Sequence, residues 1–296
     1  MNSYKTDCVS IVQAQYEPAT NHVIVRSEAT WQSGSQNHSH LQVIPMNKIP
    51  PKLKPVLAAA FWLAVWQAAS MAVGQPILLA SPAASLARLF SLMGTADFWR
   101  SLLFTLGHIL AGYALASLAG IALAMLAGRF ELVSALLSPL LAAMRSVPVA
   151  SFVIAALIWV PSKRLSVLIA FVIVLPVIYA GTLDGIRQID PRLREMARVY
   201  RVSRLDRLRA VDLPAALPSV ASALSVSIGL AWKSGVAAEV IGIPGGSVGE
   251  KLYKAKVYLA TPDLFAWTLA IVLISAGCAR LLRLGLKRVE RIGDRL

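Results

Sequence analysis

Long apolar segments limit what this chain can fold into. A helix needs about 20 largely apolar residues to cross the roughly 30 Å hydrocarbon core of a bilayer. Residues 55–73 contain no charged side chain. Comparable segments follow at residues 99–126, 132–159, 165–182, 217–241 and 264–284. Charged residues are only 15% of the chain, against about 25% in soluble domains. The prediction is an all-α membrane protein with six transmembrane helices.

Basic residues between these segments predict the orientation. Six spans place four regions on the same side of the membrane: the region just before the first span, residues 128–131, the central loop and the carboxyl-terminal end. These regions carry 18 Lys and Arg, whereas the opposite connections carry 7. Loops rich in Lys and Arg remain in the cytoplasm, so both termini are predicted to be cytoplasmic. The net charge of +14 then reflects topology rather than nucleic-acid binding.

The six predicted helices define a domain at residues 51–290. Residues 1–50 are polar and lack a helical period, which is typical of a disordered tail, here expected in the cytoplasm. They also lack the continuous apolar region of a signal peptide. Residues 291–296 are predicted to form a second, short cytoplasmic tail. Residues 82–93, between the first two spans, are predicted to form a short interfacial helix.

The most polar stretch inside the domain is Asp190–Pro214. Asp190 and Pro191 predict a helix start, because an Asp side chain can cap a helix and Pro suits its first position. One apolar face follows at helical spacing, formed by Leu193, Met196, Ala197 and Tyr200. This part is therefore predicted to be a short amphipathic helix.

A second short helix is predicted directly afterwards. Ser203 followed by Asp206 is a capping signature, which places the helix start at Arg204. Its apolar face contains Leu205, Leu208 and Val211. Leu213-Pro214 either ends this helix or leads into the next element. By charge alone, this arginine-rich loop could lie on lipid headgroups. Two amphipathic helices joined by a tight turn need a cover for their apolar faces, which favours docking to a protein.

The spacing in this loop resembles that of the permease subunits of bacterial ATP-binding-cassette importers. Their cytoplasmic loop has Glu-Ala-Ala, three residues, Gly, nine residues and Ile-x-Leu-Pro. Here Glu195-Met196-Ala197 occupies the triplet, Arg201 the Gly position and residues 211–214 the end. Arg201 in a left-handed turn would cost roughly 1–2 kcal/mol. Either the turn avoids that conformation or the fit to a partner is locally adjusted.

Three further segments resemble the branch of this family that serves nitrate, sulfonate, taurine and thiamine-precursor uptake. They are residues 111–129, 184–193 and 213–232. The resemblance implies a type I importer permease fold in the bacterial inner membrane. It also implies a homodimer that forms the path for a small solute, two ATPase subunits and a periplasmic or lipid-anchored solute-binding protein.

The same resemblance implies that the loop contains a coupling helix that seats in the ATPase subunit. The residues assigned to this contact or its support are Glu195, Met196, Ala197, Tyr200, Arg201, Leu205, Leu208, Val211, Leu213 and Pro214. No cofactor is expected on this chain, because ATP and Mg would be used by the partner.

Three charged residues fall inside predicted spans, namely Arg145, Lys233 and Glu239. A buried charge costs about 2.5–3.5 kcal/mol on the insertion scale, so each needs a function or a partner. Lys233 and Arg145 are candidates for lining a translocation path for an anionic solute, with pairing or snorkelling as the structural alternative. Glu239 is expected to be architectural.

Other classes of function receive less support. The chain lacks a phosphate-binding loop of the Gly-x-x-x-x-Gly-Lys-Ser/Thr type, so it is not expected to hydrolyse ATP. No cluster of His, Cys, Asp or Glu has metal-ligand spacing. The basic helix pair has the outline of a DNA-binding motif, but its tether between two spans disfavours that role. The main alternative is a channel or secondary carrier that works without an ATPase.

Overall fold

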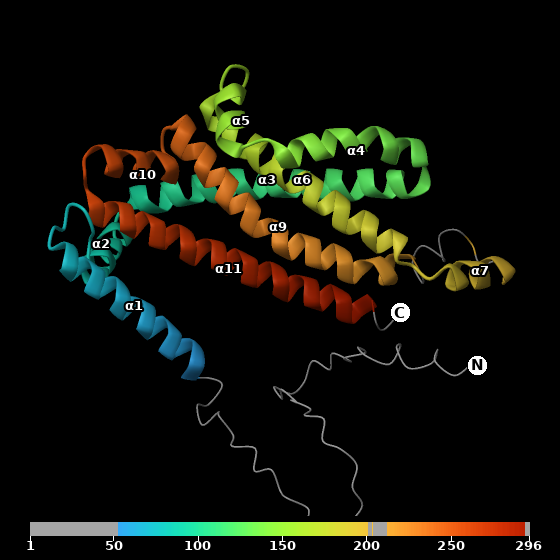
Figure 1. Cartoon of the computed structure of the whole chain (residues 1–296), viewed down its shortest axis with the longest axis horizontal. Helices are drawn as coiled ribbons and strands as arrows, with labels where there is room; N and C mark the ends of the chain where they lie inside the picture. Colours follow the sequence, from blue (N-terminus) through green and yellow to red (C-terminus); the bar gives the residue numbers. More distant parts are fainter. Residues whose placement is uncertain (1–52, 201–202, 204–211, 294–296) are drawn as a thin grey trace, which may run out of the picture. The chain divides into compact units, whose positions relative to one another are not determined.

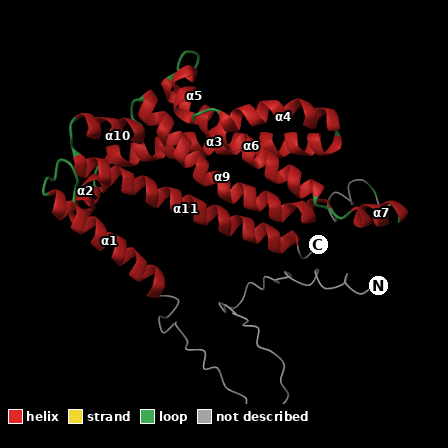
Figure 2. Cartoon of the chain, viewed as in Figure 1, coloured by secondary structure: helices red, strands yellow, loops and turns green. Residues whose placement is uncertain are grey.

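The computed structural model describes residues 53–200, 203 and 212–293, and every regular element within these ranges is a helix (Figures 1 and 2). The helices are α1 (Leu53–Val73), α2 (Pro82–Met93), α3 (Ala96–Arg129), α4 (Glu131–Ser146), α5 (Val149–Ala156), α6 (Ser162–Arg187), α7 (Pro191–Val199), α9 (Leu213–Gly242), α10 (Val248–Val257) and α11 (Thr261–Gly293). Outside the described residues lie the predicted tail at 1–50, the predicted helix from Arg204 and residues 294–296. The tail predicted at 291–296 begins inside α11, which extends to Gly293.

Five of the described helices are long and apolar enough to cross a membrane: α1, α3, α6, α9 and α11. The segment predicted as the third span is not one continuous helix, because α4 and α5 meet at an angle of 102°. Pro148 lies at the break, where it forces Val147 into an extended conformation with φ −72° and ψ 127°. Pro139, by contrast, lies inside α4 without ending it. The all-α class is confirmed, with five spans or six if the bent pair counts as one.

Helix α6 packs between α3 and α9, and this trio forms the core of the domain. Ile109 of α3, Ile178 of α6 and Ile228 of α9 are almost completely buried in one cluster. The backbones approach closely: a Cβ added to Gly112 would lie 2.4 Å from the carbonyl oxygen of Val167. On the other side of α6, a Cβ on Gly181 would lie 2.5 Å from the Ala223 Cβ. Small residues allow such contacts in lipid, where van der Waals packing drives helix association.

The small residues of α3 divide into two groups. Gly112, Ala116, Gly120 and Ala124 are buried, and the glycines among them face α6, as intrachain packing requires. Gly107 and Ala111 are exposed, and no atom lies within 4 Å of a Cβ built on Gly107. The second group therefore leaves open space beside α3 instead of filling an interface.

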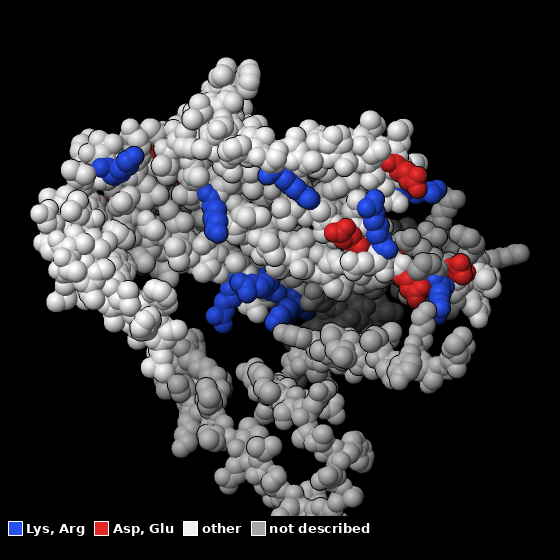
Figure 3. Space-filling view, in the orientation of Figure 1, with Lys and Arg blue, Asp and Glu red and all other residues white. Residues whose placement is uncertain are grey.

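Polar contacts tie the short helices to the long ones at the end of the bundle that carries α2 and α10 (Figure 1). The Nζ of Lys251 lies 2.5 Å from the Asp97 carboxylate, and Arg88 pairs with Asp263. Helix α2 has the bounds predicted from the sequence, and the Ser81 side chain caps it by accepting the N–H of Ala84. Most of the surface seen in Figure 3 is uncharged, as expected for a membrane domain.

A reciprocal cap starts α10. The Ser247 side chain accepts the N–H of Glu250, and the Glu250 carboxylate accepts the N–H of Gly246 at 2.6 Å. The Lys254 ammonium, which donates a hydrogen bond to Glu250, lowers the pKa of that carboxyl below its usual value. This ordered turn and short amphipathic helix agree with the prediction from the Gly and Pro residues before it.

The contact at Gly112 can be tested by adding one methyl group. We expect Gly112→Ala to destabilise the domain by about 1–3 kcal/mol, because the new Cβ meets a backbone oxygen that cannot move away. Gly277→Ala is the matched control: Gly277 lies in α11 with nothing within 4 Å of the added Cβ. Thermal unfolding in detergent measures both variants. Equal unfolding temperatures for the two would contradict this account of the α3–α6 interface.

Candidate coupling segment and translocation path

The chain leaves α6 and enters α7 through a short, well-anchored turn. The N–H of Gln188 donates to the Asp184 carbonyl oxygen at 3.0 Å and closes α6. The Asp190 carboxylate then accepts the N–H of Arg192 at 2.8 Å, which is the predicted helix cap. Ile189 is buried, with 3% of its surface exposed. Helix α7 is therefore connected to the end of α6 by only three residues with defined contacts.

Helix α7 exposes most of the apolar face that its sequence predicts. Ala197 is buried, but Leu193 and Met196 are 41% and 51% exposed, and Tyr200 just beyond the helix is 77% exposed. Glu195 is also exposed. A short helix held at its base, with large apolar side chains outward, has the form of a docking element.

The rest of the predicted coupling segment is described only in part. Leu213 begins α9, and Pro214 lies in its first turn, so this dipeptide leads into the next element rather than ending the previous one. Pro suits the first turn of a helix because no intrahelical acceptor is available there for an N–H. Arg201, Leu205, Leu208 and Val211 lie outside the described residues, and the question about the Arg201 turn stays open.

Lys233 lies on a face of α9 that the described chain does not cover. The same face carries Ser222, Val226 and Gly229, all exposed and separated by one helical turn each. Toward the α7 end, this face borders a cavity of about 510 Å³ between α6 and α9, whose polar lining includes Asp184 and Ser219. Lys233 thus belongs to an exposed track along one helix, in which Ser222 is the other polar residue.

Arg145 has a partner on a neighbouring helix. Its Nη2 donates to the carbonyl oxygen of Pro176 in α6 at 2.7 Å. Arg145 also lines a cavity of about 260 Å³ together with Asp184 and Arg187. This hydrogen bond gives the Arg145 guanidinium a backbone partner, which agrees with the structural explanation for this charge instead of a place on the path. The structure does not bring Lys233 into this cavity.

Glu239 joins three helices. Its side chain is almost completely buried, and its Oε2 accepts the hydroxyl of Thr105 from α3 at 2.7 Å. The same oxygen accepts the N–H of Gly249 from α10 at 3.3 Å. Thr105 Oγ1 in turn accepts the N–H of Val248 at 3.0 Å. This arrangement matches the architectural role expected for Glu239.

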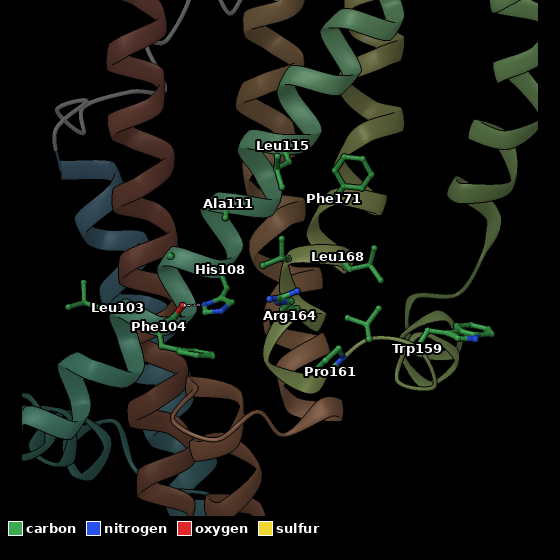
Figure 4. Close-up of a pocket in the computed structure, with 13 residues that line it drawn as sticks. Leu103, Phe104, His108, Ala111, Leu115, Trp159, Pro161, Arg164, Leu168 and Phe171 are labelled. Carbon is green, nitrogen blue, oxygen red and sulfur yellow. Dashed lines mark hydrogen bonds between the residues drawn. The ribbon is translucent and has the colours of Figure 1, made fainter.

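A larger cavity contains residues that the sequence reasoning did not single out. Its volume is about 950 Å³, and it lies between α3, α6 and the α5–α6 turn at residues 157–161. His108 from α3 and Arg164 from α6 line it and project into the space between the helices (Figure 4). A histidine within an apolar span was the available signal for His108. Arg164 had been counted only as a charge outside the membrane.

The fold and the site together define a polytopic membrane protein with a short docking helix between two of its spans. The chain belongs to the family described as binding-protein-dependent transport system inner membrane component, whose pattern matches residues 116–291. It is therefore the permease subunit of an ATP-binding-cassette importer, and an integral membrane protein.

Curated relatives lie in the branch that the sequence resembles. The nitrate import permease protein NrtB of Synechococcus elongatus is 29% identical over 211 residues, which cover 66% of this chain and 75% of that protein. The taurine transport system permease protein TauC of Escherichia coli is 28% identical, over 76% of this chain and 82% of that protein. The putative aliphatic sulfonates transport permease protein SsuC of Escherichia coli is 32% identical, over 71% and 83%.

Solved structures support the fold. A chain of an amino acid ABC transporter matches with a TM-score of 0.53 and 18% identity, covering 72% of this chain and 97% of that chain. A chain of a bacterial ABC transporter that imports the polysaccharide alginate matches with a TM-score of 0.53 and 16% identity, over 81% and 94%. The fold is the predicted one of type I importer permeases.

The role of Thr105 in the Glu239 network yields a stability prediction. Thr105→Val keeps the side-chain shape but removes the hydroxyl that Glu239 and the Val248 N–H both use. We expect a loss of about 1–3 kcal/mol, because buried polar groups lose their partner. Thr268→Val is the control, since the exposed Thr268 hydroxyl only donates to the Leu264 carbonyl in its own helix. Thermal unfolding that is unchanged in Thr105→Val would refute the proposed structural role.

Proposed function

We propose that this permease forms the translocation path of an ATP-driven importer for a small anion, such as nitrate, taurine or another sulfonate. It works as a homodimer with two separate ATPase subunits and a periplasmic or lipid-anchored solute-binding protein. The names of its relatives support the solute class, and the cations on its membrane faces, Lys233, Arg145 and Arg164, complement such solutes. The relatives include permeases for nitrate, taurine and aliphatic sulfonates.

The exposed apolar face of α7 is the observation that supports coupling of this permease to an ATPase. Met196 and Tyr200 are more than half exposed, although α7 is capped by Asp190 and anchored through buried Ile189 and Ala197. Such a surface is costly to leave in water and fits a groove in a protein partner. Arg192, Arg194 and Arg198 share this helix with Glu195, so the assignment rests on the exposed apolar face and on the loop spacing shared with importer permeases. We therefore assign α7 to the contact with the ATPase.

The connection of α7 to two long helices suggests how force reaches the membrane. Closure of an ATPase dimer around ATP would move α7, and the three-residue link would pass this movement to α6. Since α6 packs against α3 and α9, these helices would shift together as a rigid group. ATP and its Mg would stay on the ATPase, and this chain would contribute no catalytic residue.

The proposed orientation places α7 and both chain ends in the cytoplasm of a cell with its permease in the inner membrane. The excess of Lys and Arg on that side supports this assignment. The end of the bundle with α2 and α10 then faces the solute-binding protein. In the homodimer, the exposed track of Ser222, Val226, Gly229 and Lys233 on α9 would line the path between the two copies.

Reversal of one charge on α7 tests the coupling assignment. We expect Glu195→Lys to reduce solute uptake by at least about tenfold in proteoliposomes that contain the assembled importer, a loss of roughly 1.4 kcal/mol in coupling. ATP hydrolysis should persist without solute stimulation, and membrane insertion should be unchanged. Glu131→Lys serves as the control, because Glu131 is an exposed acidic residue in the first turn of α4. Wild-type uptake in Glu195→Lys would remove the assignment, and uptake without any ATPase would favour the channel or carrier alternative.

Neutralisation of Lys233 tests the path. We expect Lys233→Met to lower the uptake of an anionic solute several-fold by removing an attractive charge from the α9 track. Initial uptake rates of labelled taurine or nitrate measure the effect, and Lys256→Met on the exposed side of α10 is the control. If both variants take up solute at the same rate as the unaltered permease, Lys233 does not line the path.

A further inference from the structure

The cavity between α3 and α6 has one cationic side chain, Arg164, and one polar ring, His108, in an otherwise apolar lining. None of the described residues that line the cavity is Asp or Glu. The remaining lining is largely aromatic and aliphatic, with Phe104, Trp159 and Phe171 as its rings. An apolar pocket with a few convergent polar groups is the usual form of a small-ligand site.

His108 is held in a defined orientation by the residue one turn before it. Its ring stacks on Phe104 with the ring centres 4.0 Å apart. Its Nδ1 lies 2.8 Å from the Phe104 carbonyl oxygen, which can only accept, so Nδ1 must carry the proton. This contact leaves Nε2 as the nitrogen that a ligand can approach, and Figure 4 shows the ring on the cavity side of α3.

The size of the cavity depends on small residues of α3. Gly107 and Ala111 line it and are exposed, and no atom lies within 4 Å of a Cβ built on Gly107. Five residues after Gly107, Gly112 holds α3 tightly against Val167 of α6. The close contact between the helices therefore begins beyond the cavity, which His108 and Arg164 line from the two sides.

We propose that this cavity binds the anionic oxygen group of a transported solute, a sulfonate or nitrate, with Arg164 as the donor. A guanidinium matches a planar or tetrahedral oxyanion with parallel N–H donors, and Phe104 would contact the organic part. The proposal rests on the proposed function, because it assumes that the permease carries an anion. To the proposed function it adds the place where the anion binds and the side chain that binds it.

A lipid phosphate has the same chemistry and is the rival occupant. The location of the cavity favours the solute. The cavity lies near the start of α3 and the start of α6, at the bundle end opposite α7, where the proposed orientation places the solute-binding protein. A solute released at this end meets Arg164 first. We therefore commit to a solute anion and use the lipid as an outcome of the test.

Cysteine labelling tests the site without the ATPase or the binding protein. Ala111→Cys is introduced into the full chain with Cys8→Ser and Cys278→Ser, in nanodiscs of phosphatidylcholine. The rates of modification by the anionic sulfonatoethyl and the cationic trimethylammonioethyl methanethiosulfonates are compared. We expect the anionic reagent to be favoured, and Arg164→Gln to reduce this preference by about tenfold. Leu118→Cys, on an exposed part of α3 outside the cavity, should show no effect of Arg164→Gln.

Competition separates the possible occupants. We expect sodium methanesulfonate to slow the labelling of Ala111→Cys, choline chloride to have no effect, and Arg164→Gln to abolish the protection. The proposal is overturned if methanesulfonate gives no protection. It is also overturned if protection requires phosphatidylglycerol in the nanodisc and ignores methanesulfonate, since the site is then a lipid site. Uptake by the assembled importer is measured separately, so loss of this site and loss of the proposed function are distinguishable.

Discussion

The close contact between α3 and α6 at Gly112 is the interaction on which the rest of this structure depends. In a bilayer the hydrophobic effect does not drive helices together, so the bundle depends on packing at short range. Gly112 allows α3 to touch the backbone of α6 near Val167, and Gly181 allows α9 to approach from the other side. Helix α6 thereby becomes the shared centre of the domain. Both functional regions start from it: α7 follows its last residue, and the α3–α6 cavity opens beside its first turn.

Polar groups inside the membrane follow one rule, which is that each needs a partner within the protein or a place on a path. Glu239 finds Thr105 and the backbone of α10, and Arg145 finds the carbonyl oxygen of Pro176. Lys233 differs, because it stands on an exposed face of α9. His108 and Arg164 differ as well, because they face a cavity instead of a buried acid. Lys233 and Arg164 have no acidic partner among the described residues, which suits the proposed transport of an anion.

Most of the fold could be predicted from the lengths of apolar segments and from local capping chemistry. The bounds of α2 and the Asp190 cap of α7 follow from short-range rules, and the structure has both. The break between α4 and α5 could not be predicted, because Pro139 and Pro148 look alike in the sequence and only Pro148 ends a helix. The cavity was missed for a different reason. His108 and Arg164 meet only through the pairing of α3 with α6, and spacing alone does not tell that Gly107 faces open space while Gly112 faces a backbone.

The stacking of His108 on Phe104 has a consequence for how such a permease can change affinity. His108 is positioned by its own helix, and α3 is in close contact with α6 at Gly112, so His108 and Arg164 belong to one rigid pair of helices. Their separation would then stay constant while other helices move. A solute bound between them would be released by a change in access to the cavity rather than by weaker binding. One wall of that access route is the α5–α6 turn, whose Trp159 is 77% exposed.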